Sequence, residues 1–89
     1  MPEIKVAIEH SVGLHARPAS LFVQTAKRHK SEIRVSHNGR SANAKSILSV
    51  LTLGAGKGAE LTIQAEGDDA EAALGALQAL IADNFGEAA

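Results

Sequence analysis

Apolar residues alternate with polar ones in short stretches of the chain, as in strands that bury one face. The apolar positions of three such stretches are Ile4, Val6 and Ile8, then Ile33 and Val35, and then Leu61, Ile63 and Ala65. Between the second and the last stretch, His37-Asn38-Gly39-Arg40 is typical of a hairpin, because Asn-Gly tolerates the positive φ angles of a type I′ turn. A further short strand is therefore predicted from Arg40 to Asn43.

The helical repeat appears in three other segments. From Ala16 to about His29 an apolar stripe is followed by cationic residues in the last turn, and a second helix is predicted over Ile47–Leu53 with Ser46 as N-cap and Gly54 as its end. Asp68 or Asp69 is expected to cap the last helix. The stripes of the first and last helices are Ala19, Phe22, Val23 and Ala26, and then Ala73, Leu74, Leu77, Leu80 and Ile81.

The second predicted helix has large apolar side chains on nearly all sides, although a short helix on a sheet buries only one side. With Val50 and Leu53 facing the core, Ile47, Leu48 and Leu51 would form an exposed patch, and such patches usually bind a partner. The alternative is that a loop or the C-terminus covers them.

The predicted order of elements is β-α-β-β-α-β-α. This order favours a two-layer α+β fold with the helices on one face of an antiparallel sheet. No linker, internal repeat or low-complexity tract interrupts the chain, so we expect one domain over residues 1–89.

The composition of the chain argues against several classes of function. The chain has two phenylalanines, no tryptophan or tyrosine and no cysteine, which disfavours base stacking, disulfides and thiolate metal sites. No apolar stretch is long enough for a signal peptide or a membrane span, so we expect a soluble cytoplasmic protein. Residues 1–45 have a net charge of +5 and residues 46–89 a net charge of −6. The positive charges do not cluster as in nucleic-acid binders, and an acidic protein partner or phosphate explains them equally well.

The segment from Gly13 to Phe22 is the strongest chemical signal. It places His15 at the beginning of a helix, with Arg17 and Pro18 in the first turn, where proline fits because no N–H is needed. A helix N-terminus offers unpaired N–H groups, here those of Ala16 and Arg17, and the positive end of the dipole. Neutral imidazole is a nucleophile, so these residues predict a histidine that carries phosphate.

Other candidates are weaker. The segment Gly54-Ala55-Gly56-Lys57-Gly58 is not a nucleotide-binding loop, because a helix precedes it, a strand follows it and no Ser or Thr follows the lysine. His10, His29 and His37 belong to three different elements and lack metal-ligand spacing, so they are interpreted as surface residues and no metal site is predicted.

Two motifs together resemble the HPr family, the histidine-containing phosphocarriers of the bacterial phosphoenolpyruvate:sugar phosphotransferase system. They are Gly13-Leu14-His15-Ala16-Arg17-Pro18-Ala19 and Ala44-Lys45-Ser46-Ile47-Leu48-Ser49-Val50-Leu51, followed by Leu53-Gly54 and Lys57-Gly58. The resemblance covers nearly the whole chain. It implies an open-faced β-sandwich with strand order 1-4-2-3. Val12 departs from the family, which often has Asn, Ser or Thr there.

The resemblance also implies roles for particular residues. His15 would accept phosphate on Nδ1 from phosphorylated enzyme I and pass it to an enzyme IIA domain, and Arg17 would assist. Ser46 matches a regulatory phosphoserine of the family. The resemblance therefore implies two further partners, HPr kinase/phosphorylase and a catabolite-control repressor. The residues that would contact partners are Ser20, Ile47, Leu48 and Leu51. The resemblance implies a monomer without a cofactor, bound neither to nucleic acid nor to membrane, that is not an independent catalyst.

Three alternatives remain open at this point. The chain could be a small enzyme that hydrolyses acyl phosphates, with Arg17 binding the phosphate. It could be a binding module that docks only through the second helix and does not need His15. Within the carrier family, it could belong to a regulatory nitrogen branch rather than to sugar uptake.

Overall fold

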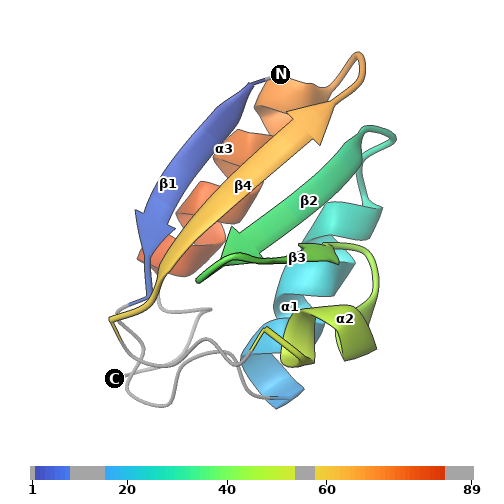
Figure 1. Cartoon of the computed structure of the whole chain (residues 1–89). Helices are drawn as coiled ribbons and strands as arrows, with labels where there is room; N and C mark the ends of the chain where they lie inside the picture. Colours follow the sequence, from blue (N-terminus) through green and yellow to red (C-terminus); the bar gives the residue numbers. More distant parts are fainter. Residues whose placement is uncertain (1, 9–15, 54–57, 84–89) are drawn as a thin grey trace.

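The computed structural model describes residues 2–8, 16–53 and 58–83, with the backbone alone for residues 16–18. The order of elements is the predicted one (Figure 1). The strands are β1 (Glu3–Ala7), β2 (Glu32–His37), β3 (Arg40–Asn43) and β4 (Glu60–Glu66), and the helices are α1 (Ala16–Lys27), α2 (Ile47–Leu51) and α3 (Ala70–Ala82).

The four strands form one antiparallel sheet in the order β1-β4-β2-β3, which confirms the expected topology. The last strand of the sequence is therefore central, with Ile63 opposite Ile4 of β1 on one side and Val35 of β2 on the other. Asn38 and Gly39 both have positive φ, at 52° and 84°, as the predicted type I′ hairpin requires.

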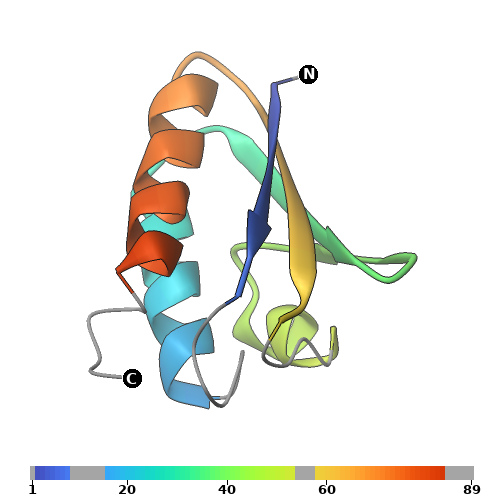
Figure 2. The same cartoon turned by 90° about the vertical axis from the view of Figure 1, so that its left-hand side faces the viewer.

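The helices form the second layer. Figure 2 shows α1 and α3 on the same face of the sheet, where they contact each other, and α2 contacts α1 and β3 at one end of this layer. The polar residues that alternate with the apolar ones along the strands lie on the opposite face of the sheet. This arrangement confirms the predicted two-layer α+β fold.

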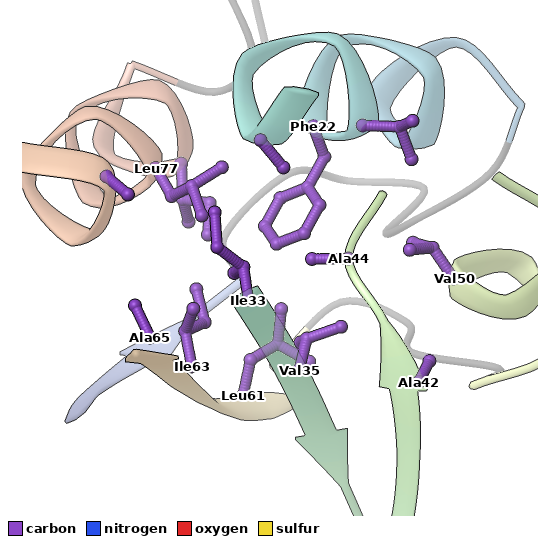
Figure 3. Close-up of a cluster of buried hydrophobic side chains, with 14 of the residues drawn as sticks. Phe22, Ile33, Val35, Ala42, Ala44, Val50, Leu61, Ile63, Ala65 and Leu77 are labelled. Atoms are coloured by element: carbon purple, nitrogen blue, oxygen red, sulfur yellow. The ribbon is translucent and has the colours of Figure 1, made fainter. Parts of the chain in front are cut away.

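The core lies between the layers and contains every predicted inward position of β2, β4 and α1. In Figure 3, Phe22 points from α1 toward the sheet and lies among side chains from the other elements. Small residues such as Ala44 and Ala65 are fully buried, which lets the two layers approach closely. In the edge strand β1, Ile4 and Val6 are only half-buried, and Ile8, just beyond the strand, is fully buried.

The ends of two helices differ from the prediction. α1 ends at Lys27 rather than near His29, because Arg28 and His29 donate to carbonyls only three residues back, at 3.2 Å each, and the turn tightens. α2 ends at Leu51 rather than Leu53 for the same reason, since Leu53 N donates to Val50 O at 3.2 Å. Leu53 is buried as predicted, and the proposed end at Gly54 lies outside the described residues.

Asp69 occupies the predicted N-cap position of α3, but its side chain does not cap the helix. The carboxylate instead accepts hydrogen bonds from Lys30 N and Ser31 N, both at 2.9 Å, and from Ser31 Oγ. These donors follow the end of α1, so the contact ties that segment to the beginning of α3. Three donors on one carboxylate outweigh the single bond that a cap would supply.

Candidate functional site

The first turn of α1 is the backbone part of the candidate site. The helix begins at Ala16, the residue directly after His15, and Arg17 and Pro18 lie in its first turn as predicted. No acidic residue lies in that turn, so no carboxylate of the helix itself neutralises the positive end of the dipole. His15, Val12 and the side chains of residues 16–18 lie outside the described residues.

One turn farther along α1, Ser20 is half-buried. Its hydroxyl oxygen accepts a hydrogen bond from Gln24 Nε2 at 3.1 Å, which joins two polar side chains at i, i+4 spacing. The Ser20 hydroxyl can in addition donate one hydrogen bond of its own.

At the beginning of α2, Ser46 is the N-cap, as predicted. Its backbone is extended, with φ −118° and ψ 113°, and its carbonyl accepts from Val50 N at 3.0 Å. The hydroxyl accepts from Ser49 N at 3.4 Å, which is long for a hydrogen bond. The Ser46 hydroxyl is thus half-buried and held by one long hydrogen bond.

The apolar patch is smaller than predicted. Ile47 is 42% exposed and Leu48 is 72% exposed, and they are the large apolar side chains left exposed in the part of the chain that the structure describes. Leu51 is half-buried and packs against the core, so it belongs only to the margin of the patch. Val50 is fully buried as predicted. We call Ile47 and Leu48 the α2 patch.

The fold brings the two parts of the site to the same end of the molecule. α1 and α2 contact each other, and both views place the beginning of α1 at the same end of the molecule as α2 (Figures 1 and 2). The α2 patch and Ser46 are therefore near the helix terminus that follows His15 in the chain. A protein that docks on α2 would also reach that terminus.

Lys45, next to Ser46, was not singled out from the sequence. Its ammonium donates to the carbonyl of His29 at 2.8 Å, which links the beginning of α2 to the segment after α1. A cation near the C-terminal end of a helix also suits the helix dipole. Sequence spacing gives no sign of this contact, because the two residues belong to different elements.

The other predicted surface histidines form local bonds. His29 Nδ1 is 3.1 Å from Thr25 O, and His37 Nδ1 is 3.3 Å from Glu60 O. Within the described ranges, no three His, Cys, Asp or Glu side chains are grouped as a metal site would require. His10 and the glycine-rich segment 54–57 lie outside these ranges.

Comparison with known proteins assigns the family. The family model described as "PTS HPr component phosphorylation site" matches residues 2–83. A structure of HPr from Thermoanaerobacter tengcongensis is 46% identical, with a TM-score of 0.96 and full coverage of both chains. The phosphocarrier protein HPr of Bacillus anthracis is 44% identical over 90% of this chain and 95% of its own, with a TM-score of 0.86.

The chain belongs to the HPr family. Proteins of this family are phosphocarriers of the phosphotransferase system rather than independent catalysts, which excludes the hydrolase alternative. The similar structures also include a protein whose name refers to catabolite repression. Crh of Bacillus subtilis, described as a domain-swapped dimer, is 40% identical over 93% of this chain and 95% of its own, with a TM-score of 0.73.

Membership of the HPr family implies interaction with other proteins of the phosphotransferase system. No helix in the described ranges has both the length and the apolar character needed to cross a membrane.

Proposed function

We propose that this chain carries a phosphoryl group on His15 between phosphorylated enzyme I and enzyme IIA domains, with phosphoenolpyruvate as the ultimate donor. The observation that supports this most is the start of α1 at Ala16, directly after His15, in a chain of the HPr family. Nδ1 of the neutral imidazole attacks phosphorus while the bond from phosphorus to the donor histidine breaks. The same exchange in the next complex passes the group to the acceptor histidine.

The helix terminus suits this chemistry in both states of His15. The positive end of the dipole disfavours the imidazolium form, so the ring stays nucleophilic near neutral pH. After transfer, the N–H groups of Ala16 and Arg17 and the Arg17 guanidinium stabilise the added negative charge. A helix dipole contributes only about 0.3–1 kcal/mol at an exposed site, so the group is not trapped. A carrier needs this moderate stabilisation, because it must release what it accepts.

The α2 patch supplies the docking surface for enzyme I and enzyme IIA in this proposal. Ile47 and Leu48 lose water on docking, and Leu51 and Ser20 line the margin of the contact. A few side chains that become buried at the centre of an interface supply most of its affinity. We place this action in the cytoplasm, with the chain working as a monomer in sugar uptake.

Ser46 is the proposed regulatory site. A phosphate on its hydroxyl suits the beginning of α2 but lies next to Ile47, where it opposes docking of an acidic partner. HPr kinase/phosphorylase would add the phosphate, and a catabolite-control repressor would recognise the modified form.

A second function is favoured by the similarity to Crh. In that role the chain acts as a regulatory partner that docks only through α2, and His15 is dispensable. A nitrogen-branch carrier, in contrast, needs His15 as the sugar-uptake carrier does. Dependence on His15 therefore separates the carrier roles from the regulatory role.

The test is phosphorylation of the full chain by enzyme I with labelled phosphoenolpyruvate. We expect one phosphoryl group per chain, labile in acid and stable in alkali, and none on the His15→Ala variant. The variant should fold normally, which a thermal melt checks. An unlabelled wild-type chain, or a label that survives in His15→Ala, would refute the proposal.

A further inference from the structure

A hollow of about 470 Å³ lies over β2 and β3 and extends to Lys45, the residue before the N-cap of α2. This volume is within the range of sites that bind small molecules. Its lining residues are Glu32, Ile33, Arg34, Ser41, Ala42, Asn43 and Lys45. The family assignment and the carrier role make no use of this hollow.

Arg34 is the main cation of the hollow. It is exposed in the middle of β2, and the strand register places Asn43 of β3 and Gln64 of β4 opposite it. Both are neutral amides, and Gln64 Nε2 already donates to Glu3 Oε1 at 3.0 Å. No carboxylate is therefore directly opposite the guanidinium, whose paired N–H groups match the oxygens of phosphate.

The other polar residues of the lining add hydrogen-bond donors. Asn43 Oδ1 accepts from Lys45 N at 2.9 Å, which leaves the Asn43 amide nitrogen free to donate. Lys45 Nζ gives one N–H to His29 O at 2.8 Å and has two more. The lining thus carries two cations, one amide donor and the hydroxyl of Ser41 against a single acid, Glu32.

The carboxylate of Glu32 favours a ligand that has hydroxyl groups in addition to its phosphate. In the sheet it is directly opposite Glu66, and two carboxylates at such a position repel each other. A ligand that brings hydroxyl donors to Glu32 offsets this repulsion, whereas a bare anion adds to it. The chemistry of the hollow therefore fits a molecule with a phosphate at one end and hydroxyl groups at the other.

We propose that the hollow over β2 and β3 binds a small hydroxyl-bearing phosphate ester, with its phosphate on Arg34 and Lys45 and its hydroxyls on Glu32. This site is independent of the proposed carrier chemistry, since it needs neither His15 nor the α2 patch. A sugar phosphate and a mononucleotide share the required groups, and the test compares both.

The test is an NMR titration of the ¹⁵N-labelled full chain at constant ionic strength with glucose 6-phosphate, AMP, inorganic phosphate and glucose. With a phosphate ester, we expect saturable shifts at the amides of Glu32, Arg34, Ser41, Asn43 and Lys45. Arg34→Gln should weaken binding by about tenfold or more, as loss of a charge-assisted contact predicts. Arg28→Gln, an exposed arginine outside the hollow, should bind as the wild type does.

The four probes separate the parts of the proposal. Inorganic phosphate should bind more weakly than the better ester, and glucose should cause no saturable shift. Equal binding of inorganic phosphate and the esters would refute the role of Glu32. Shifts confined to the beginning of α1, no saturable shift with either ester, or equal losses in the Arg34 and Arg28 variants would overturn the site. Tighter binding of glucose 6-phosphate or of AMP identifies the source of the phosphate.

Discussion

At the scale of single residues, the Asp69 carboxylate is the group that its surroundings perturb most clearly among those the structure describes. Its hydrogen bond from Ser31 Oγ, with the backbone N–H groups of Lys30 and Ser31, lowers the pKa of Asp69 from 3.8 to about 2. The contact joins residues 38 positions apart in the chain. It therefore stabilises the fold more strongly in the ionised form than in the protonated form.

The depressed pKa of Asp69 predicts a pH dependence of stability. The stabilisation is complete above the unfolded-state pKa of 3.8 and is lost as the pH falls toward about 2. Asp69→Asn should unfold at lower urea concentration at neutral pH, and its midpoint should change less across this acid range than that of the wild type. Asp68→Asn removes an exposed neighbouring charge and is the control. If the urea midpoints of the wild type and Asp69→Asn fell in parallel with decreasing pH, the proposed role of the Asp69 carboxylate would be wrong.

The guanidinium of Arg17 is expected to speed phosphate transfer. Arg17→Ala should still be phosphorylated, but both transfer steps should slow by about tenfold or more, because a charge-assisted hydrogen bond to phosphate contributes roughly 1.5–3 kcal/mol. Rapid-quench measurement of transfer from enzyme I and to enzyme IIA tests this. Arg28→Ala removes an exposed arginine just beyond the other end of the same helix and should keep wild-type rates. Equal rates for both variants would reduce Arg17 to a surface charge.

At the scale of elements, two glycines near or within α3 have opposite roles. Gly67 has φ +146°, and a Cβ there would lie 2.5 Å from Ser31 Oγ and 2.8 Å from Ser31 Cα. A Cβ added at Gly75, inside the helix, would have no neighbouring atom within 4 Å. The first glycine permits the close approach of two segments, whereas the second only weakens its helix.

Alanine at each glycine should therefore have opposite effects on stability. Gly67→Ala should lower the free energy of unfolding, because it displaces Ser31 from Asp69 and strains the backbone. Gly75→Ala should raise it by about 0.5–1 kcal/mol, the usual gain for alanine in a helix interior. Urea unfolding of both variants measures this. Destabilisation by Gly75→Ala, or none by Gly67→Ala, would contradict the packing described.

The α2 element connects stability to docking. Ser46→Asp should keep or slightly raise the melting temperature, since a carboxylate suits an N-cap. It should raise the apparent KM for transfer from enzyme I, because the charge must be desolvated beside Ile47. Ser46→Ala is the control without that charge. An unimpaired Ser46→Asp protein, or one impaired only because it unfolds, would contradict the docking role of α2.

Most elements could be predicted because each has a local signal, such as the alternation in β4, the stripe of α1 or the Asn38-Gly39 turn. The ends of α1 and α2 were misplaced because tightened turns depend on backbone bonds that no side-chain pattern reveals. The role of Asp69 was missed because its partners, Lys30 and Ser31, are remote in sequence. Leu51 was placed in the exposed patch because residue type does not show which side of a short helix meets the core.

At the scale of the whole molecule, the charge asymmetry of the sequence is not a simple asymmetry in space. β4, from the acidic half, lies between β1 and β2, which come from the basic half. The strand order could be expected from the family resemblance but not from periodicity, which does not determine how strands pair. The same topology places α2 beside the beginning of α1, although the motifs on these helices are separate in the sequence.

Onward transfer of phosphate distinguishes a phosphocarrier from a protein that only binds partners. The most direct test is a relay with purified components. The chain is labelled through enzyme I, freed from enzyme I and phosphoenolpyruvate, and mixed with an unlabelled enzyme IIA domain. We expect the label to move from this chain to enzyme IIA, and His15→Ala to transfer none. Label that stays on the chain, or that reaches enzyme IIA equally well through His15→Ala, would contradict it.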